Sequence, residues 1–134
     1  MKKTIIFILS VILMIAASVC IVRYYQANHG FSDWMYPHAF GDYLKSHDGD
    51  GTWISAAEGR WYDGSWQMRA RFEPAPTGPH AMYWWFNMTP DFYFKQTDKL
   101  ADDGFTQVYY QDYKWPDGSI LRQGVWHKSH DLMK

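Results

Sequence analysis

Two patterns of apolar residues divide the chain near residue 25. Residues 5–22 are apolar apart from two serines and one cysteine, whereas later segments alternate with the periods of strands and helices. A helix of 18 residues is about 27 Å long, which is enough to cross the hydrocarbon core of a membrane. The pattern predicts a single transmembrane helix within residues 1–25, followed by a folded domain over residues 26–134.

The charges that flank the apolar run predict its orientation. Lys2 and Lys3 precede the run and only Arg23 follows it, which favours a cytoplasmic N-terminus and a domain on the outer side of a bacterial inner membrane. Two alternatives stay open: cleavage of a signal peptide near Ala16-Ala17-Ser18, and lipidation of Cys20. Each of these alternatives also exports the domain.

The periodicity after residue 25 predicts two helices and five strands. Ser32 is a candidate N-cap for the first helix, which has Pro37 in its first turn, and Thr89 is the candidate N-cap for the second helix, which begins at Pro90. The expected strands are residues 52–62, 66–72, 81–86, 105–115 and 119–128.

Two of these strands have side-chain patterns that predict their surroundings. In residues 66–72, apolar residues alternate with Gln67, Arg69 and Arg71, which predicts one apolar face and one cationic, solvated face. Residues 81–86 are apolar throughout and predict a buried strand.

A short phrase occurs twice and predicts two hairpins. Arg60-Trp61-Tyr62-Asp63-Gly64-Ser65 returns as Lys114-Trp115-Pro116-Asp117-Gly118-Ser119. Asp-Gly between two strands is typical of a tight hairpin turn. We therefore predict an α+β fold of two tandem helix-plus-β-hairpin repeats, about residues 29–74 and 86–128. Neither copy could bury its apolar face alone, so the two are expected to share one core.

Composition narrows the possible partners. Aromatic residues make up 19% of the chain, which favours a folded domain rich in strands. Residues 24–134 carry ten Lys and Arg against fourteen Asp and Glu, a balance that opposes binding to a phosphate backbone. Nucleic acid is therefore not expected as a partner, and with Cys20 as the one cysteine the domain has no disulfide.

The second copy resembles a known bacterial repeat. Phe86-Asn87-Met88-Thr89-Pro90, then Asp103-Gly104-Phe105, a strand ending in Tyr113 and a return strand ending in Gly124-Val125-Trp126 are similar to the "tornado" repeats at the N-terminus of polyglycine hydrolases. The helix between the first two motifs carries the matching Asp98 and Leu100. In that family, catalysis resides in a separate β-lactamase-like domain with Ser-x-x-Lys, and no serine here has Lys three residues later. The resemblance implies a fold and an accessory or binding role.

The sequence predicts no catalytic, cofactor-binding or metal-binding residue. A nucleophilic enzyme needs an activated Ser or Cys beside a base, and no such motif is present. Of the six histidines only His127 and His130 are closely spaced, and Asp48-Gly49-Asp50-Gly51 lacks the later residues of a calcium loop.

The surplus of tryptophan points to binding. Eight Trp in a domain this small cannot all be fully buried, and exposed Trp, Tyr and Arg mark binding surfaces. The candidate surface consists of the repeated phrase and the cationic strand, namely Arg60, Trp61, Asp63, Lys114, Trp115, Asp117, Arg69 and Arg71.

From these observations we expect a membrane-anchored, non-catalytic module that binds an envelope protein. It would act as an inhibitor or immunity-type protein, or as an accessory protein of the envelope. The alternative is a cell-envelope hydrolase, or a wall-glycan-binding protein that serves one.

Overall fold

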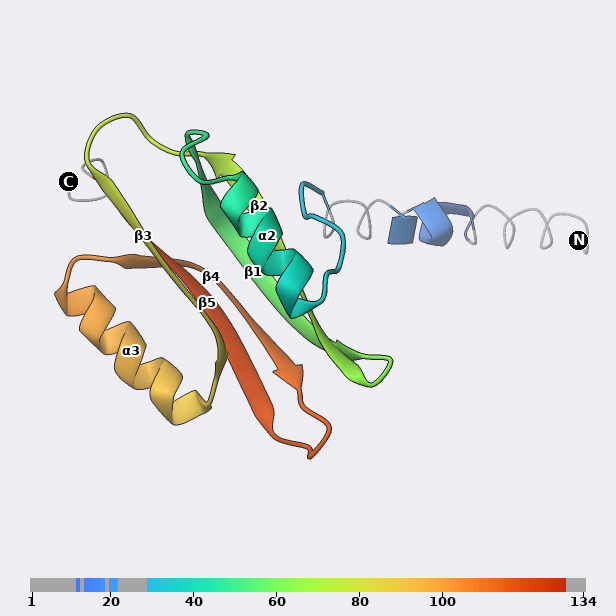
Figure 1. Cartoon of the computed structure of the whole chain (residues 1–134). Helices are drawn as coiled ribbons and strands as arrows, with labels where there is room; N and C mark the ends of the chain where they lie inside the picture. The colour runs from blue at the N-terminus through green and yellow to red at the C-terminus, as the bar shows by residue number, and fades with distance from the viewer. Residues whose placement is uncertain (1–11, 13, 19, 22–28, 130–134) are drawn as a thin grey trace, which may run out of the picture. The chain divides into compact units, whose positions relative to one another are not determined.

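The computed structural model describes residues 12, 14–18, 20–21 and 29–129, and the chain divides into two compact units, residues 1–30 and residues 31–134. The described residues of the first unit up to residue 21 are helical. The second unit is mostly β-structure and carries every residue of the predicted binding surface (Figure 1).

Five strands and two helices follow one another in the second unit. A two-stranded sheet pairs β1 with β2, and a three-stranded sheet has the order β3-β5-β4, with all pairs antiparallel. The elements in chain order are α2 (Pro37–Ser46), β1 (Thr52–Tyr62), β2 (Ser65–Pro74), β3 (His80–Met88), α3 (Pro90–Asp102), β4 (Thr106–Lys114) and β5 (Ile120–Ser129).

Strand β5 separates two clusters of buried apolar residues. On one face, Val125 packs in a cluster with residues of β1, β2 and α2, including Phe40 and Ile54. On the other face, Trp126 packs with Tyr93 and Leu100 of α3. Helix α3 therefore covers one face of the three-stranded sheet, and β1, β2 and α2 lie against the opposite face (Figure 1).

The predicted pair of equivalent helix-plus-hairpin repeats with one shared core is wrong. Residues 80–88, most of which lie between the two proposed copies, form β3 and pair with β5, so one sheet has three strands and the other has two. The fold is mostly β rather than a duplicated α+β unit. The buried residues also form two clusters, because α3 packs on one face of β5 while β1, β2 and α2 pack on the other.

The two Asp-Gly pairs both lie in hairpin loops, but the loops differ. Asp63 and Gly64 both have positive φ, 49° and 73°, and Tyr62 pairs with Ser65, as in a two-residue type I′ turn. In the second hairpin the strands end at Lys114 and begin again at Ile120. Pro116 stands where the first copy has Tyr62, and because proline has no N–H it cannot continue the ladder.

The segment before α2 pairs with β2 and does not start a helix. Ser32 N and Met35 N donate to Ala70 O and Met68 O, both on β2, at 2.9 and 2.8 Å. Ser32 is therefore not the predicted N-cap, and α2 begins at Pro37 without a side-chain cap. The N-cap predicted for α3 is confirmed, because the Thr89 side chain accepts from Phe92 N.

The predicted transmembrane helix is also not found in the part of the chain that the structure describes. None of the helices there combines the length and the apolar composition that crossing a membrane requires. Most of the predicted segment, residues 5–22, lies outside the described residues.

Candidate functional site

The two hairpin loops bring Trp61 and Trp115 into contact. Their ring centroids are 4.8 Å apart with an interplanar angle of 63°, an edge-to-face arrangement. Trp61 is the next-to-last residue of β1 and is 39% exposed, and Trp115 follows β4 and is half-buried. Two tryptophans that are 54 positions apart in the chain therefore form one aromatic surface.

Arg60 precedes Trp61 in β1, so its side chain lies on the opposite face of the strand, where aromatic rings hold it. Its guanidinium lies 4.2 Å from the ring centroid of Trp34 and 4.5 Å from that of Tyr62, within the range of cation–π contacts. The same group donates to Gln67 Oε1 from Nε at 2.9 Å and from Nη2 at 2.7 Å. We call Arg60, Trp61, Tyr62, Lys114 and Trp115 the tip surface.

Arg69 and Arg71 lie further along β2 and do not belong to the tip surface. The Arg69 side chain is 12% exposed, its Nη2 lies 2.6 Å from Glu58 Oε2, and its guanidinium stacks 4.5 Å from the ring centroids of Phe31 and Trp34. Arg71 donates from Nε to Ser55 Oγ at 3.1 Å. The prediction that this face of the strand is solvated is wrong for Arg69, because residues 31–35 cover it.

Asp63 and Asp117 have different places in their loops. Asp63 occupies the first central position of the type I′ turn and is exposed. Asp117 Oδ1 accepts from Ser119 N at 2.8 Å and from Ser119 Oγ at 2.6 Å. These hydrogen bonds lower the pKa of Asp117, since they stabilise the carboxylate. The Asp117 carboxylate therefore orders its own loop.

A buried polar junction connects the two sheets below the tip surface. Tyr109 OH donates to Glu58 Oε1 at 2.5 Å, and burial together with this hydrogen bond raises the pKa of Tyr109. Gln111 Oε1 accepts from Gly59 N at 3.0 Å, and Gln111 Nε2 donates to Gly59 O at 3.2 Å. A side-chain amide thus completes the edge of β1 as a neighbouring strand would.

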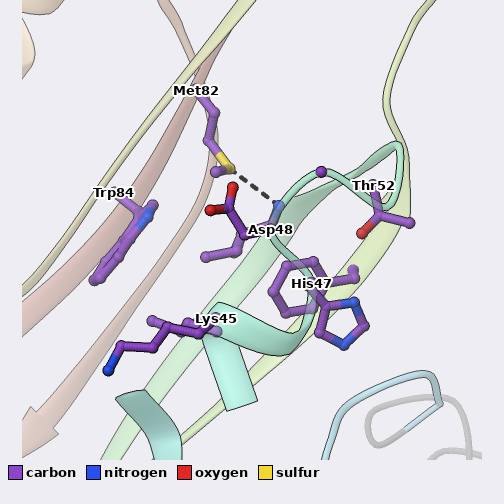
Figure 2. A pocket seen from close by; sticks show the side chains of 10 residues that line it. Lys45, His47, Asp48, Thr52, Met82 and Trp84 are labelled. Atoms are coloured by element: carbon purple, nitrogen blue, oxygen red, sulfur yellow. Dashed lines mark hydrogen bonds between the residues drawn. The ribbon is translucent and has the colours of Figure 1, made fainter. Parts of the chain in front are cut away.

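The second prominent feature is a groove between α2 and β3. An apolar hollow of about 410 Å³ includes Phe40, Trp66 and Trp85 in its wall, and a second hollow of about 310 Å³ follows it, with Leu44 and Trp84 lining both. Figure 2 shows the second hollow, with Met82 and Trp84 extending from β3. Lys45 and His47 reach it from the end of α2, and Asp48 and Thr52 are also in its wall.

Several of these features could not be read from the sequence. Phe31 and Trp34 lie on either side of Ser32, the predicted N-cap of the first helix, and no local pattern shows that they stack on arginines of β2. The pairing of Gln111 with Gly59 joins residues 52 positions apart. The signal that was available for the groove is the run Tyr83-Trp84-Trp85-Phe86, whose lack of charge was interpreted as burial.

Within residues 12, 14–18, 20–21 and 29–129, no three His, Cys, Asp or Glu side chains form a group suited to a metal ion. Of the two closely spaced histidines, His127 is buried, with Nε2 2.6 Å from Ile54 O, and His130 lies outside the described residues. Tyr113, buried below Trp115, donates to Asn87 Oδ1, and burial raises its pKa to about 12. His127 and Tyr113 are thus engaged in hydrogen bonds that hold elements together.

Comparisons of the chain with protein-family models, with curated proteins and with solved structures give no match. The resemblance to the tornado repeats stays a prediction from the quoted motifs.

Proposed function

We propose that the domain is a non-catalytic protein-binding module that contacts its partner through the tip surface. The observation that carries this proposal is the contact between Trp61 and Trp115. Trp, Tyr and Arg are the residues that contribute most to binding energy in protein interfaces, and the tip surface contains all three. Trp61 and Tyr62 expose 39% and 57% of their surface, so a partner can reach them.

The tip surface is also organised before any partner binds. The two indoles contact each other, and Arg60 is fixed by two rings and by Gln67. Side chains that are already ordered lose less conformational entropy on binding, which favours affinity. Lys114 and Arg60 add positive charge beside the rings, which suits a partner with acidic residues around an apolar centre.

The proposed partner is a protein of the bacterial envelope, which the module inhibits or assists. This part of the proposal rests on the sequence of residues 1–25, which predicts export, and a cleaved leader alone would be enough for it. The resemblance to tornado repeats supports the same accessory role.

The test is a pull-down from envelope extract with the full chain as bait, followed by calorimetry with the purified captured protein. The variant Trp61→Ala, Trp115→Ala should weaken the affinity at least about a hundredfold, since two central tryptophans are removed. The matched control is Phe94→Ala, Tyr110→Ala, which removes two exposed aromatic residues from α3 and β4, outside the tip surface. Equal affinity of the wild type and the Trp61, Trp115 variant for every captured protein would contradict the proposal.

A further inference from the structure

The two outer strands of the three-stranded sheet, β3 and β4, pair only with β5 in the part of the chain that the structure describes. Strand β3 pairs with β5 on one side, and no described strand pairs with its second side. The other edges have neighbours: the segment containing Phe31 and Met35 bridges to β2, and the Gln111 side chain of β4 bonds Gly59 of β1, so that β4 lies beside β1. The outer edge of β3 therefore differs from the remaining edges in this part of the chain.

Strand β3 has few of the features that keep an exposed edge from pairing, and its irregularity in register is confined to the end between Trp85 and Met88. Natural proteins place charged residues or proline on such edges. The sequence His-Ala-Met-Tyr-Trp-Trp-Phe-Asn-Met of β3 has no Lys, Arg, Asp, Glu or Pro. Trp84 and Trp85 are consecutive and so point to opposite faces, and they expose 37% and 39% of their surface. An added strand would cover both.

The groove beside this edge is apolar in one hollow and carries charged residues in the next. The apolar hollow, which Phe40 and Trp85 help to line, contains no charged residue in its wall. The hollow that continues from it carries Lys45 and Asp48. Complementarity of charge therefore requires an occupant that is uncharged and apolar beside the tryptophans and polar or charged at the end that reaches Lys45 and Asp48.

We propose that the groove between α2 and β3 binds an extended segment of a partner protein, which pairs with the outer edge of β3 as an additional strand. Main-chain hydrogen bonds to β3 would supply affinity, and the two hollows would select the side chains. A second copy of this chain is a poorer occupant, because its own α2 flanks its β3 and would meet the same groove. The site is separate from the tip surface and extends the proposed function to a second contact.

The probe is the octapeptide (Thr-Val)4-amide with fluorescein on its N-terminal amine; its peptide part is uncharged and favours extended structure. We expect the full chain to bind it with a dissociation constant in the micromolar range by fluorescence anisotropy. The same peptide with N-methyl groups on alternate residues cannot donate along one edge, and it should bind at least about tenfold more weakly.

Variants of α2 and β3 locate the site. Gly41 lines the apolar hollow and no atom lies within 4 Å of where its Cβ would be, so Gly41→Leu fills the hollow without removing a contact. It should weaken binding at least about tenfold, as should Trp84→Lys, which puts a charge on the edge. The matched control is Ala39→Leu, on the exposed part of the same helix, which should change the affinity less than about twofold.

The outcomes separate this site from the tip surface. The variant Trp61→Ala, Trp115→Ala should bind the octapeptide as the wild type does, whether or not the proposed function holds. Absence of binding at 1 mM peptide, on the order of a thousand times the expected dissociation constant, would overturn the proposal. Equal affinity for the N-methylated peptide would also overturn the proposal. A dimer in sedimentation that Trp84→Lys abolishes would overturn it as well, because that result would assign the edge to a second copy.

Discussion

The two faces of β5 are buried to a similar degree but are held by different forces. Gln123, Val125 and His127 face β1, and two of these three side chains make polar contacts there. Gly124 and Trp126 face α3, and there the contact depends on side-chain packing. The Trp126 ring lies over Gly124, and a Cβ added to Gly124 would be 2.4 Å from Trp126 Cη2.

The difference shows how one strand can serve two neighbours. Directional hydrogen bonds on the β1 face fix how the two sheets are aligned, since Gln111, Gln123 and Gly59 match at only one register. On the α3 face the Nε1 of Trp126 is buried without a hydrogen-bond partner, so the indole contributes through packing alone. We expect the free energy of unfolding to fall when side-chain volume is changed on the α3 face, and when a polar group is removed on the β1 face.

The largest effect is expected from adding volume to the α3 face. Gly124→Val introduces a residue that favours strands, yet it should lower the free energy of unfolding by about 3 kcal/mol or more, because the new side chain overlaps the Trp126 ring. Urea denaturation measures this loss. In the double variant Gly124→Val, Trp126→Ala the ring is absent, so the valine should cost much less than it does in the wild type.

The control for this substitution is Gly41→Ala in α2, where a Cβ meets no other atom and alanine favours the helix. It should stabilise the protein by up to about 1 kcal/mol. Equal losses for Gly124→Val with and without Trp126 would show that the packing argument is wrong.

The elements of this comparison differ in how far the sequence reveals them. Strand β1 was predicted with its observed bounds, and the first Asp-Gly turn was predicted correctly, because periodicity and turn residues are local. The pairing of β3 with β5 was missed, and it decides the number of strands in the sheet. Which strand pairs with which depends on contacts between distant residues, and an apolar run such as residues 81–86 looks the same in a central strand and in an edge strand.

The candidate site was predictable only in part. The repeated phrase selected Trp61 and Trp115, and the structure places them together, but the same reasoning included Arg69 and Arg71, which bind Glu58 and Ser55 instead. The alternation of β2 correctly separates its two faces. It could not show that Phe31 and Trp34 cover one of them.

A smaller effect is expected from removing a polar group on the β1 face. Gln111→Met keeps the approximate volume but leaves Gly59 N and Gly59 O without their partner, which should cost about 2 kcal/mol in the free energy of unfolding. Hydrogen exchange of the Gly59 amide should accelerate in the same variant, because that N–H is no longer bonded.

The matched control is Gln107, which lies four residues earlier in β4, opposite Trp126 and before a shift in the pairing register. Gln107 has a buried Nε2 without a hydrogen-bond partner, so Gln107→Met should be neutral or slightly stabilising. If both substitutions destabilised the protein equally, the Gln111 amide would not be the cause.

The smallest effect depends on pH and also belongs to the β1 face. The ring of His127 stacks on Trp53 with centroids 3.6 Å apart, and its Nε2 donates to Ile54 O. Burial lowers the pKa of His127 below its ordinary value of 6.5, although the Ile54 carbonyl acts in the opposite direction. The unfolded chain therefore binds a proton at a higher pH than the folded chain does.

It follows that the contribution of His127 to stability is present above about pH 6.5 and is lost as the pH falls below that value. One proton can contribute at most about 1.4 kcal/mol per pH unit. The measurement is the difference in unfolding free energy between the wild type and His127→Gln at several values from pH 7.5 to pH 5.0, which should shrink at the acid end. The matched control is His38→Gln, which removes a histidine side chain that is 93% exposed. A His127 difference that stayed constant with pH would mean that the buried ring takes up its proton as readily as the unfolded chain does.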